Sequence, residues 1–220
     1  AIAVGRGTKA SGGSSVALGD GASALAGTAT ALGANAVASG GDSIAIGGAR
    51  AVSGGGFAAG TGAYAGSPNG IALGTGAGAG TVGTEAGDRT SHIAIGTGAG
   101  RNVVGNQTTA IGYQAGSDVT GLHNVASHAG ANLQGNYNVA IGHEANRNAG
   151  SVENATAVGG QSDAARDGVA VGYGAGAGDT GVAVGSQSTA GDGGVALGRN
   201  ATADGSHVAI GIGSAASSSD

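Results

Sequence analysis

The sequence predicts an all-β protein, a β-roll of about 15 stacked rungs that each hold two short strands. Three observations lead to this fold class. A tetrapeptide of the form Val/Ile-Ala-Val/Ile/Leu-Gly recurs along the chain, the spacing of its copies is nearly constant, as from Gly172 to Gly185 and Gly198, and 52 of the 220 residues are glycine. Glycine at this density costs about 1 kcal/mol per helical position, and the apolar residues recur at every second position, so both features argue against a helical fold.

The tetrapeptide defines the rungs. Complete copies end at Gly5, Gly19, Gly47, Gly74, Gly96, Gly142, Gly172, Gly185, Gly198 and Gly211. Three further copies begin with threonine and two, at 57–60 and 125–128, are degraded. A rung as short as the usual interval between these glycines can hold two short strands and two tight turns, and cannot form a three-sided coil. Stacked neighbours then supply the core that a single rung lacks.

The first and third residues of each tetrapeptide share one face of a strand, because side chains alternate between faces. We expect these aliphatic side chains to point into the roll and to meet small alanines of the second strand. The predicted core ladder consists of Val16, Leu18, Ile44, Ile46, Ile71, Leu73, Ile93, Ile95, Val139, Ile141, Val169, Val171, Val182, Val184, Val195, Leu197, Val208 and Ile210. The opposite face, built from alanine, serine and glycine, is then expected to point outward and to let other copies of the chain pack closely.

Composition narrows the function classes. The chain has no cysteine, so disulfides and thiolate metal sites are excluded, and no run of about 18 apolar residues that could span a membrane. A net charge of −5 with only eight basic residues argues against nucleic acid as a partner. Motifs for a nucleophile elbow, a phosphate loop or a His-Glu-x-x-His site are missing, so we expect neither catalysis nor a cofactor. The histidines lack spaced ligand pairs, so no metal is expected, and His92 and His207 are expected to point outward.

Residues 1–220 are expected to form one repetitive domain with longer insertions between some rungs. The insertions span 75–91, 97–107, 113–123 and 143–154. Loops on a rigid scaffold often carry function, so charged residues in these segments are candidate ligand contacts. The candidates are Glu85, Asp88, Arg89, Arg101, Asp118, Glu144 and Arg147. The alternative is that the insertions are solvated variations in turn length.

Several rungs extend the tetrapeptide by a preceding serine or asparagine, as in 15–19, 43–47 and 138–142. This pattern resembles the YadA-like head of trimeric autotransporter adhesins, and the resemblance covers nearly the whole chain. It implies a left-handed parallel β-roll and an intertwined homotrimer. It also implies a bacterial cell-surface protein that is anchored in the outer membrane and attaches to host matrix proteins, host cells or abiotic surfaces.

Two other functions fit the same repeat. The segment 109–116 also resembles repeats of phage tail fibres, and a passive surface spacer would have the same fold. The chain opens in mid-pattern and ends without a recognisable neck or heptad stalk, so we expect it to be a piece of a longer protein whose membrane anchor lies outside this sequence.

Overall fold

The computed structural model describes residues 1–78, 91–128, 133–146 and 151–217. The chain forms two compact units, Ala1–Val119 and Thr120–Asp220. In these described segments every regular element is a β-strand. The prediction of an all-β fold made of stacked rungs is confirmed.

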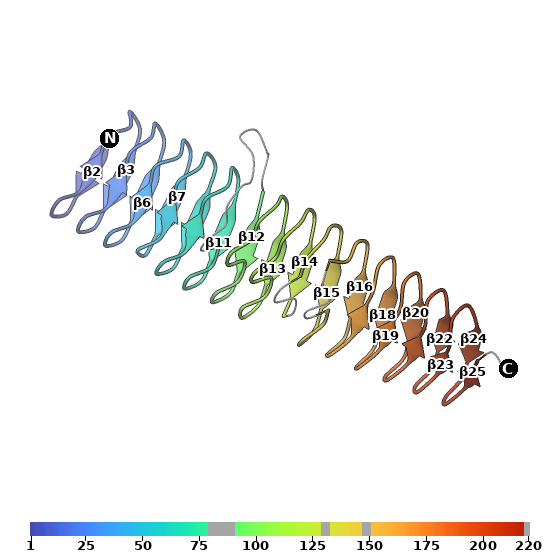
Figure 1. The fold of residues 1–220 in the computed structure, drawn as a ribbon. Helices are drawn as coiled ribbons and strands as arrows, with labels where there is room; N and C mark the ends of the chain where they lie inside the picture. The colour runs from blue at the N-terminus through green and yellow to red at the C-terminus, as the bar shows by residue number, and fades with distance from the viewer. Residues whose placement is uncertain (79–90, 129–132, 147–150, 218–220) are drawn as a thin grey trace. The chain divides into compact units, whose positions relative to one another are not determined.

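The first unit is a parallel β-solenoid with a long and a short sheet. Its long sheet runs, in chain order, through β1 (Ile2–Val4), β3 (Val16–Leu18), β5 (Thr30–Leu32), β7 (Ile44–Ile46), β9 (Phe57–Ala59), β11 (Ile71–Leu73), β12 (Ile93–Ile95) and β13 (Thr109–Ile111). Its short sheet contains β2 (Lys9–Ala10), β4 (Ser23–Ala24), β6 (Val37–Ala38), β8 (Arg50–Ala51) and β10 (Tyr64–Ala65). From β1 to β10 the chain passes from the long sheet to the short sheet and back in each rung, so strands one rung apart lie side by side (Figure 1).

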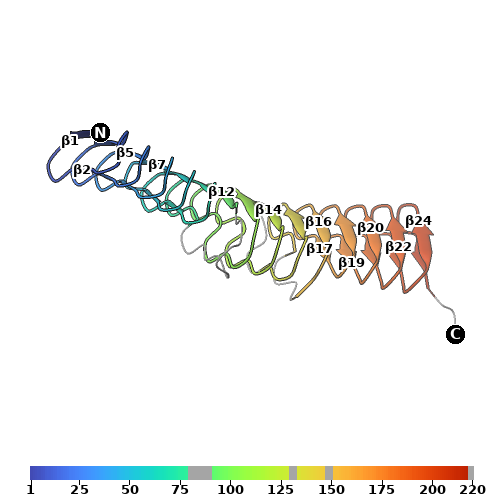
Figure 2. The same ribbon diagram turned by 90° about the horizontal axis from the view of Figure 1, so that it is seen from above.

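The second unit repeats this plan. Its long sheet contains β14 (Val125–Ser127), β15 (Val139–Ile141), β16 (Thr156–Val158), β18 (Val169–Val171), β20 (Val182–Val184), β22 (Val195–Leu197) and β24 (Val208–Ile210). Its short sheet contains β17 (Asp163–Ala164), β19 (Gly176–Ala177), β21 (Thr189–Ala190), β23 (Thr202–Ala203) and β25 (Ala215–Ala216). Figure 2 shows β16, β20 and β24 along one side of the coil, with β17 and β19 along the other.

Two β-turns close most of the regular rungs, by which we mean rungs with a strand in both sheets. In the rung that begins at β18, the Gly172 carbonyl accepts the Ala175 N–H at 3.3 Å, and the Gly178 carbonyl accepts the Gly181 N–H at 2.9 Å. Gly172 has φ +133°, and a Cβ there would lie 2.5 Å from the carbonyl oxygen of Gly185 in the next rung. The motif glycine is therefore required both by its backbone conformation and by the close stacking of rungs.

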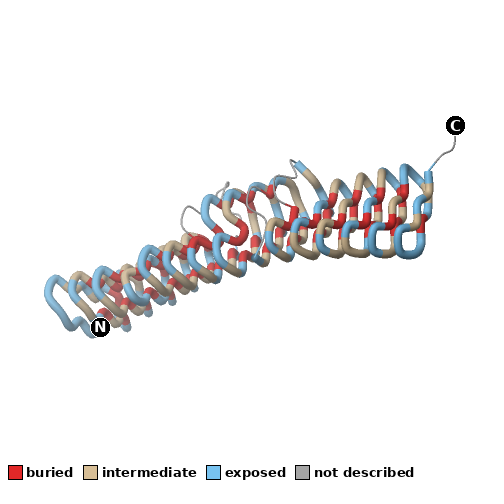
Figure 3. Tube along the Cα trace, turned by 90° about the horizontal axis from the view of Figure 1, so that it is seen from below, coloured by how far each residue is buried: buried red, intermediate tan, exposed pale blue. Residues whose placement is uncertain are grey.

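Alanine fills the interior of the rolls. The middle residues of the tetrapeptides, such as Ala45 and Ala183, have no exposed surface, and neither do the facing alanines of the short sheet, such as Ala24 and Ala203. Figure 3 shows buried positions recurring from rung to rung on the inside of the coil. A rung closed by two four-residue turns brings its two strands so close together that only methyl groups fit between them.

The expected inward orientation of the aliphatic ladder is therefore wrong for the single chain. The structure leaves half-buried or exposed all of Val16, Leu18, Ile44, Ile46, Ile71, Leu73, Ile93, Ile95, Val139, Ile141, Val169, Val171, Val182, Val184, Val195, Leu197, Val208 and Ile210. The outward face of the long sheet consists of these residues, not of alanine, serine and glycine. We had expected copies of the chain to pack through an outward face of small residues. The small residues of this sheet point inward, so that expectation is withdrawn.

A wider interior occurs in the expanded rungs, which begin at β11, β12, β13, β14 and β15. In the described residues these rungs have no named strand in a short sheet. Their cores contain Val103 and Val119 in the first unit and Leu133 in the second, each at most 1% exposed. In the second unit the stacking continues as isolated parallel bridges that join Thr120 to Gln134 and Gln134 to Ser151.

Candidate functional site

The outer face of the long sheet leaves aliphatic side chains uncovered along each unit. In the first unit Leu18, Ile46 and Ile95 are 37–39% exposed, and in the second unit Ile141 and Val184 are 40% and 38% exposed. Monomeric soluble proteins seldom display a contiguous apolar surface of this kind. The face is therefore a candidate contact surface.

Parallel pairing in strict register makes this face continuous within each unit. Ile71 pairs with Ile93 and Leu73 with Ile95, although the connection between these two strands contains the longest insertion. In the second unit Val184 pairs with Leu197. Neighbouring strands lie about 4.8 Å apart, so the aliphatic side chains form two closely spaced columns along each unit.

The charged loop residues that the structure describes, among those expected to contact ligands, each bond to a neighbouring turn. Arg101 and Asp118 lie in successive turns of the first unit, where the Asp118 N–H donates to the Arg101 carbonyl at 2.7 Å. The Asp118 carboxylate accepts Asn102 Nδ2 at 2.8 Å. Glu144, in the second unit, accepts Gln161 Nε2 at 3.3 Å. Each of these contacts ties one turn to the next, and their role in ligand binding stays a prediction.

Four of the expected contact residues fall outside the part of the chain that the structure describes. They are Glu85, Asp88, Arg89 and Arg147. Within the described residues, no group of three or more His, Asp or Glu side chains is placed to hold a metal ion. The same residues include no helix that combines the length and the apolar character needed to cross a bilayer.

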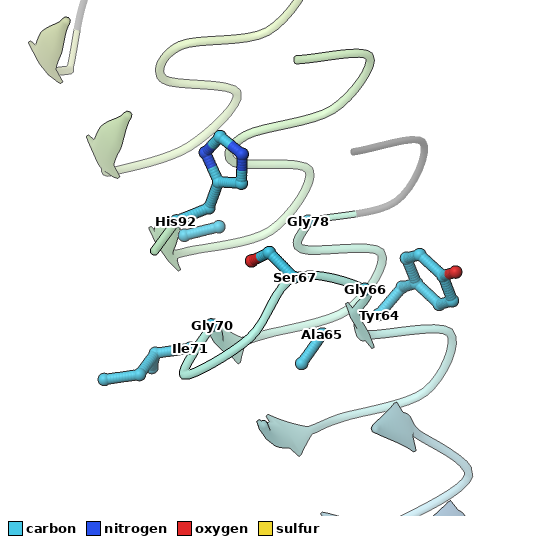
Figure 4. A pocket seen from close by; sticks show the side chains of 9 residues that line it. Tyr64, Ala65, Gly66, Ser67, Gly70, Ile71, Gly78 and His92 are labelled. Atoms are coloured by element: carbon cyan, nitrogen blue, oxygen red, sulfur yellow. The ribbon is translucent and has the colours of Figure 1, made fainter. Parts of the chain in front are cut away.

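A small cavity in the first unit is lined by His92 together with residues of the preceding rung (Figure 4). Ser67, Gly70, Ile71 and Tyr64 are among its other lining residues, and it has room for about one water molecule. His92 is 5% exposed, so its expected outward orientation is wrong. The physical reason is that His92 lies at the end of an expanded rung, where the interior is wide enough for a ring.

Neutral His92 acts as a hydrogen-bond acceptor for the next rung. Its Nδ1 accepts the Thr108 N–H at 3.3 Å, so the ring proton belongs on Nε2. Burial lowers the pKa of His92 below 6.5, and the nearby Gly105 backbone partly opposes that effect. Nε2 itself has no partner that meets hydrogen-bond geometry. A protonated ring would turn an N–H toward the Thr108 N–H, so the fold favours the neutral form.

In the expanded rungs of the second unit, asparagine side chains are the hydrogen-bond acceptors for the next rung. Asn124 Oδ1 accepts the Asn138 N–H at 3.0 Å, and Asn138 Oδ1 accepts the Ala155 N–H at 2.9 Å. Both asparagine side chains are fully buried. The repeat pattern marks their position, directly before the first residue of the tetrapeptide, but did not predict their role as buried acceptors.

The fold and the exposed ladder define a class of protein, namely a β-solenoid repeat protein that presents the sides of its coil as contact surfaces. Residues 1–22, 24–49 and 191–207 match the family model for the YadA head domain repeat (2 copies). These segments therefore carry YadA-like head repeats, and the resemblance found in the sequence is confirmed. No curated protein matches the chain. The similarity suggests self-association and an adhesin-like function at a surface, and both the YadA head family and the solenoid fold are non-enzymatic in kind.

Proposed function

We propose that this chain is the head of a bacterial trimeric autotransporter adhesin, in which three left-handed rolls assemble through their aliphatic ladders. The observation that carries the proposal is the exposed outer face of the long sheet. Alanine already fills the inside of the roll, so the exposed isoleucines and valines have no role in its own core. Three copies of the ladder facing one axis would remove this apolar surface from water.

The assembled head would then act as a stiff display element. It would be held away from the bacterial outer membrane by a stalk and an anchor that lie outside this sequence. Attachment to host matrix proteins, host cells or abiotic surfaces would use the remaining sides of the rolls. A contact spread over repeated surface suits a coil whose rungs present the same sides again and again.

The proposed assembly is tested by the mass of the chain in solution, measured by multi-angle light scattering. A trimer has three times the chain mass of 19.8 kDa. The double variant Ile46→Asp/Val184→Asp places one carboxylate on the ladder of each unit, and we expect it to run as a folded monomer because like charges would meet at the axis.

The control variant is Ser23→Asp/Thr189→Asp, which adds the same charge on the outward positions of the short sheets. It should remain trimeric. A wild-type chain that is a monomer, or a ladder variant that stays a trimer, would refute assembly through the ladder.

Adhesion is tested on the assembled head. We expect the trimer to be retained on surfaces coated with extracellular-matrix protein, on cultured cells or on bare polystyrene, above the level of an unrelated protein of equal charge. Retention on none of these surfaces would leave the fold and the trimer intact and would identify the head as a passive spacer.

A further inference from the structure

Two aromatic rings form an exposed stacked pair on the second unit. The rings of His123 and Tyr137, one rung apart, lie with their centroids 4.9 Å apart and 5° from parallel. Tyr137 remains 55% exposed although His123 covers part of its ring. The chain has only four tyrosines and one phenylalanine, so a stack of two rings on the surface is an unusual use of aromatic residues here.

The turn that carries these rings does not need them. His123 and Tyr137 have φ values of +56° and +59°, the left-handed region that bulky residues seldom occupy. Asn69, Asn154 and Asp167 hold the same place in other turns, two residues before a long-sheet strand, with φ between +55° and +56°. Asparagine and aspartate tolerate this conformation well. The rings therefore add nothing to turn formation that a smaller residue would not supply better.

Hydrogen bonds between rungs fix the backbone that carries the two rings. The residues that follow the two rings, Asn124 and Asn138, are fully buried. Asn124 Nδ2 donates to the Gly135 carbonyl and Asn138 Nδ2 to the Val152 carbonyl, both at 2.9 Å. The Tyr137 N–H donates to the Leu122 carbonyl at 2.8 Å. A ring held in place before binding loses little conformational entropy when a partner stacks on it.

The charge around the pair favours a cationic partner. Residues 120–220 contain eight acidic and three basic residues, whereas residues 1–119 contain five of each, so the whole net charge of −5 arises in the second unit. Exposed Glu153 lies in the rung after Tyr137, where its Oε1 accepts Nδ2 of Asn136, the residue before Tyr137, at 3.3 Å. The face of a tyrosine ring attracts cations, and a neighbouring carboxylate strengthens that preference.

We propose that the His123–Tyr137 pair is a docking site for an arginine or lysine side chain of a basic, extended segment of a partner protein. The guanidinium or ammonium group stacks on the Tyr137 ring, and Glu153 pairs with its charge. This docking site rests on the adhesive function proposed above. It specifies one contact and one class of partner for that function.

The test uses the assembled head with carbon-13-labelled tyrosine, whose four ring signals can be followed by NMR. A decapeptide of alternating arginine and glycine is titrated in, and we expect the Tyr137 signal to shift while the Tyr173 signal does not. Tyr137→Asn restores the residue type found in equivalent turns, so it keeps the fold, and should weaken peptide binding about three- to tenfold. Glu153→Gln should weaken binding about threefold and reduce its dependence on salt.

Matched controls separate this site from general attraction to an acidic protein. Tyr173→Ser removes another exposed tyrosine of the second unit, and it should leave peptide affinity unchanged. An alternating glutamate–glycine decapeptide should not bind. Equal affinity of wild type and Tyr137→Asn, or absence of a Tyr137 shift, would overturn the proposal, and a Tyr137 shift with maltotriose but not with the basic peptide would overturn it in favour of a carbohydrate.

Failure of this site is distinguishable from failure of the proposed function. The light-scattering mass and the retention on coated surfaces are measured on the same preparation. A trimer that adheres but shows no Tyr137 response refutes the docking site alone.

Discussion

Regular and expanded rungs provide different acceptors for the backbone N–H of the residue that precedes each long-sheet strand. In a regular rung, the residue before the long-sheet strand bonds to its own turn: the Ser43 N–H and Oγ both donate to the Gly40 carbonyl, at 3.3 Å and 2.7 Å. In an expanded rung the turn is longer and that carbonyl is not in reach. The backbone N–H of Asn138 donates instead to the Asn124 side chain in the preceding rung.

The difference shows where each kind of rung obtains its stability. A buried backbone N–H must find an acceptor, so a rung that cannot close its own turn depends on a side chain of its neighbour. His92 and Asn124 are such acceptors, and both are buried for that reason. Regular rungs depend instead on glycines that permit close stacking. Mutations should therefore damage the two kinds of rung through different residues.

The largest effect is expected where a regular rung loses its motif glycine. Gly172→Ala forces a side chain into φ +133° and places its Cβ 2.5 Å from the Gly185 oxygen. We expect a loss of about 3 kcal/mol in the free energy of unfolding, measured by denaturation followed by circular dichroism. Gly176→Ala is the control, because nothing lies within 4 Å of its Cβ and no positive φ is involved. Equal loss in both variants would show that the conformation of the motif glycine is unimportant.

A smaller effect is expected from removing a side-chain acceptor in an expanded rung. Asn138→Ala leaves the buried Ala155 N–H and the Val152 carbonyl without their partners, and should cost about 2 kcal/mol. Ser43→Ala removes one local bond from a regular turn whose backbone bond remains, and should cost about 1 kcal/mol. Chemical denaturation of the two variants checks the order, and a Ser43 variant less stable than the Asn138 variant would contradict the comparison.

The smallest effect concerns pH. The pKa of His92 is lowered in the fold relative to the ordinary value of 6.5, so the unfolded chain binds more protons between the two values. Stability should therefore rise with pH through that window and be lost as the pH falls below about 6.5. His92→Asn, which installs the acceptor used in other expanded rungs, should lessen the fall in Tm between pH 7.5 and pH 5 by about 2 °C.

The control for the pH experiment is His143→Asn, because the His143 side chain is 83% exposed. It should keep the pH dependence of the wild type. If His92→Asn also keeps it, burial of neutral His92 does not shape the acid stability.

Repeat spacing predicted the rungs and their stacking, because backbone pairing between rungs follows directly from a fixed period. It did not predict which face of the strand lies inside, since alternation alone is compatible with either. A second signal was present in the sequence. The middle position is alanine in every copy of the tetrapeptide, whereas the flanking positions vary among valine, isoleucine, leucine, threonine, phenylalanine, alanine and serine. Only alanine occurs at the middle position, because that position points into the narrow interior of the roll.

The burial of His92 could not be predicted from the regular pattern, because the length of the expanded turn sets the width of the interior there. The charged loop residues illustrate another limit. Arg101 and Asp118 lie at nearly the same place in successive rungs, and only the stacking of these turns shows that both serve the connection between rungs.

The pairing of Ile71 with Ile93 has a consequence for how such chains change over time. The long connection 74–92 reaches the same register as the shorter connection 60–70, because the ladder strands, not the turn, determine where the next rung begins. Insertions and deletions can therefore accumulate in the connections between ladder strands while the frame that carries them stays constant. A protein built in this way can alter its connections without redesigning its architecture, and such a connection is a natural place for grafting a foreign peptide.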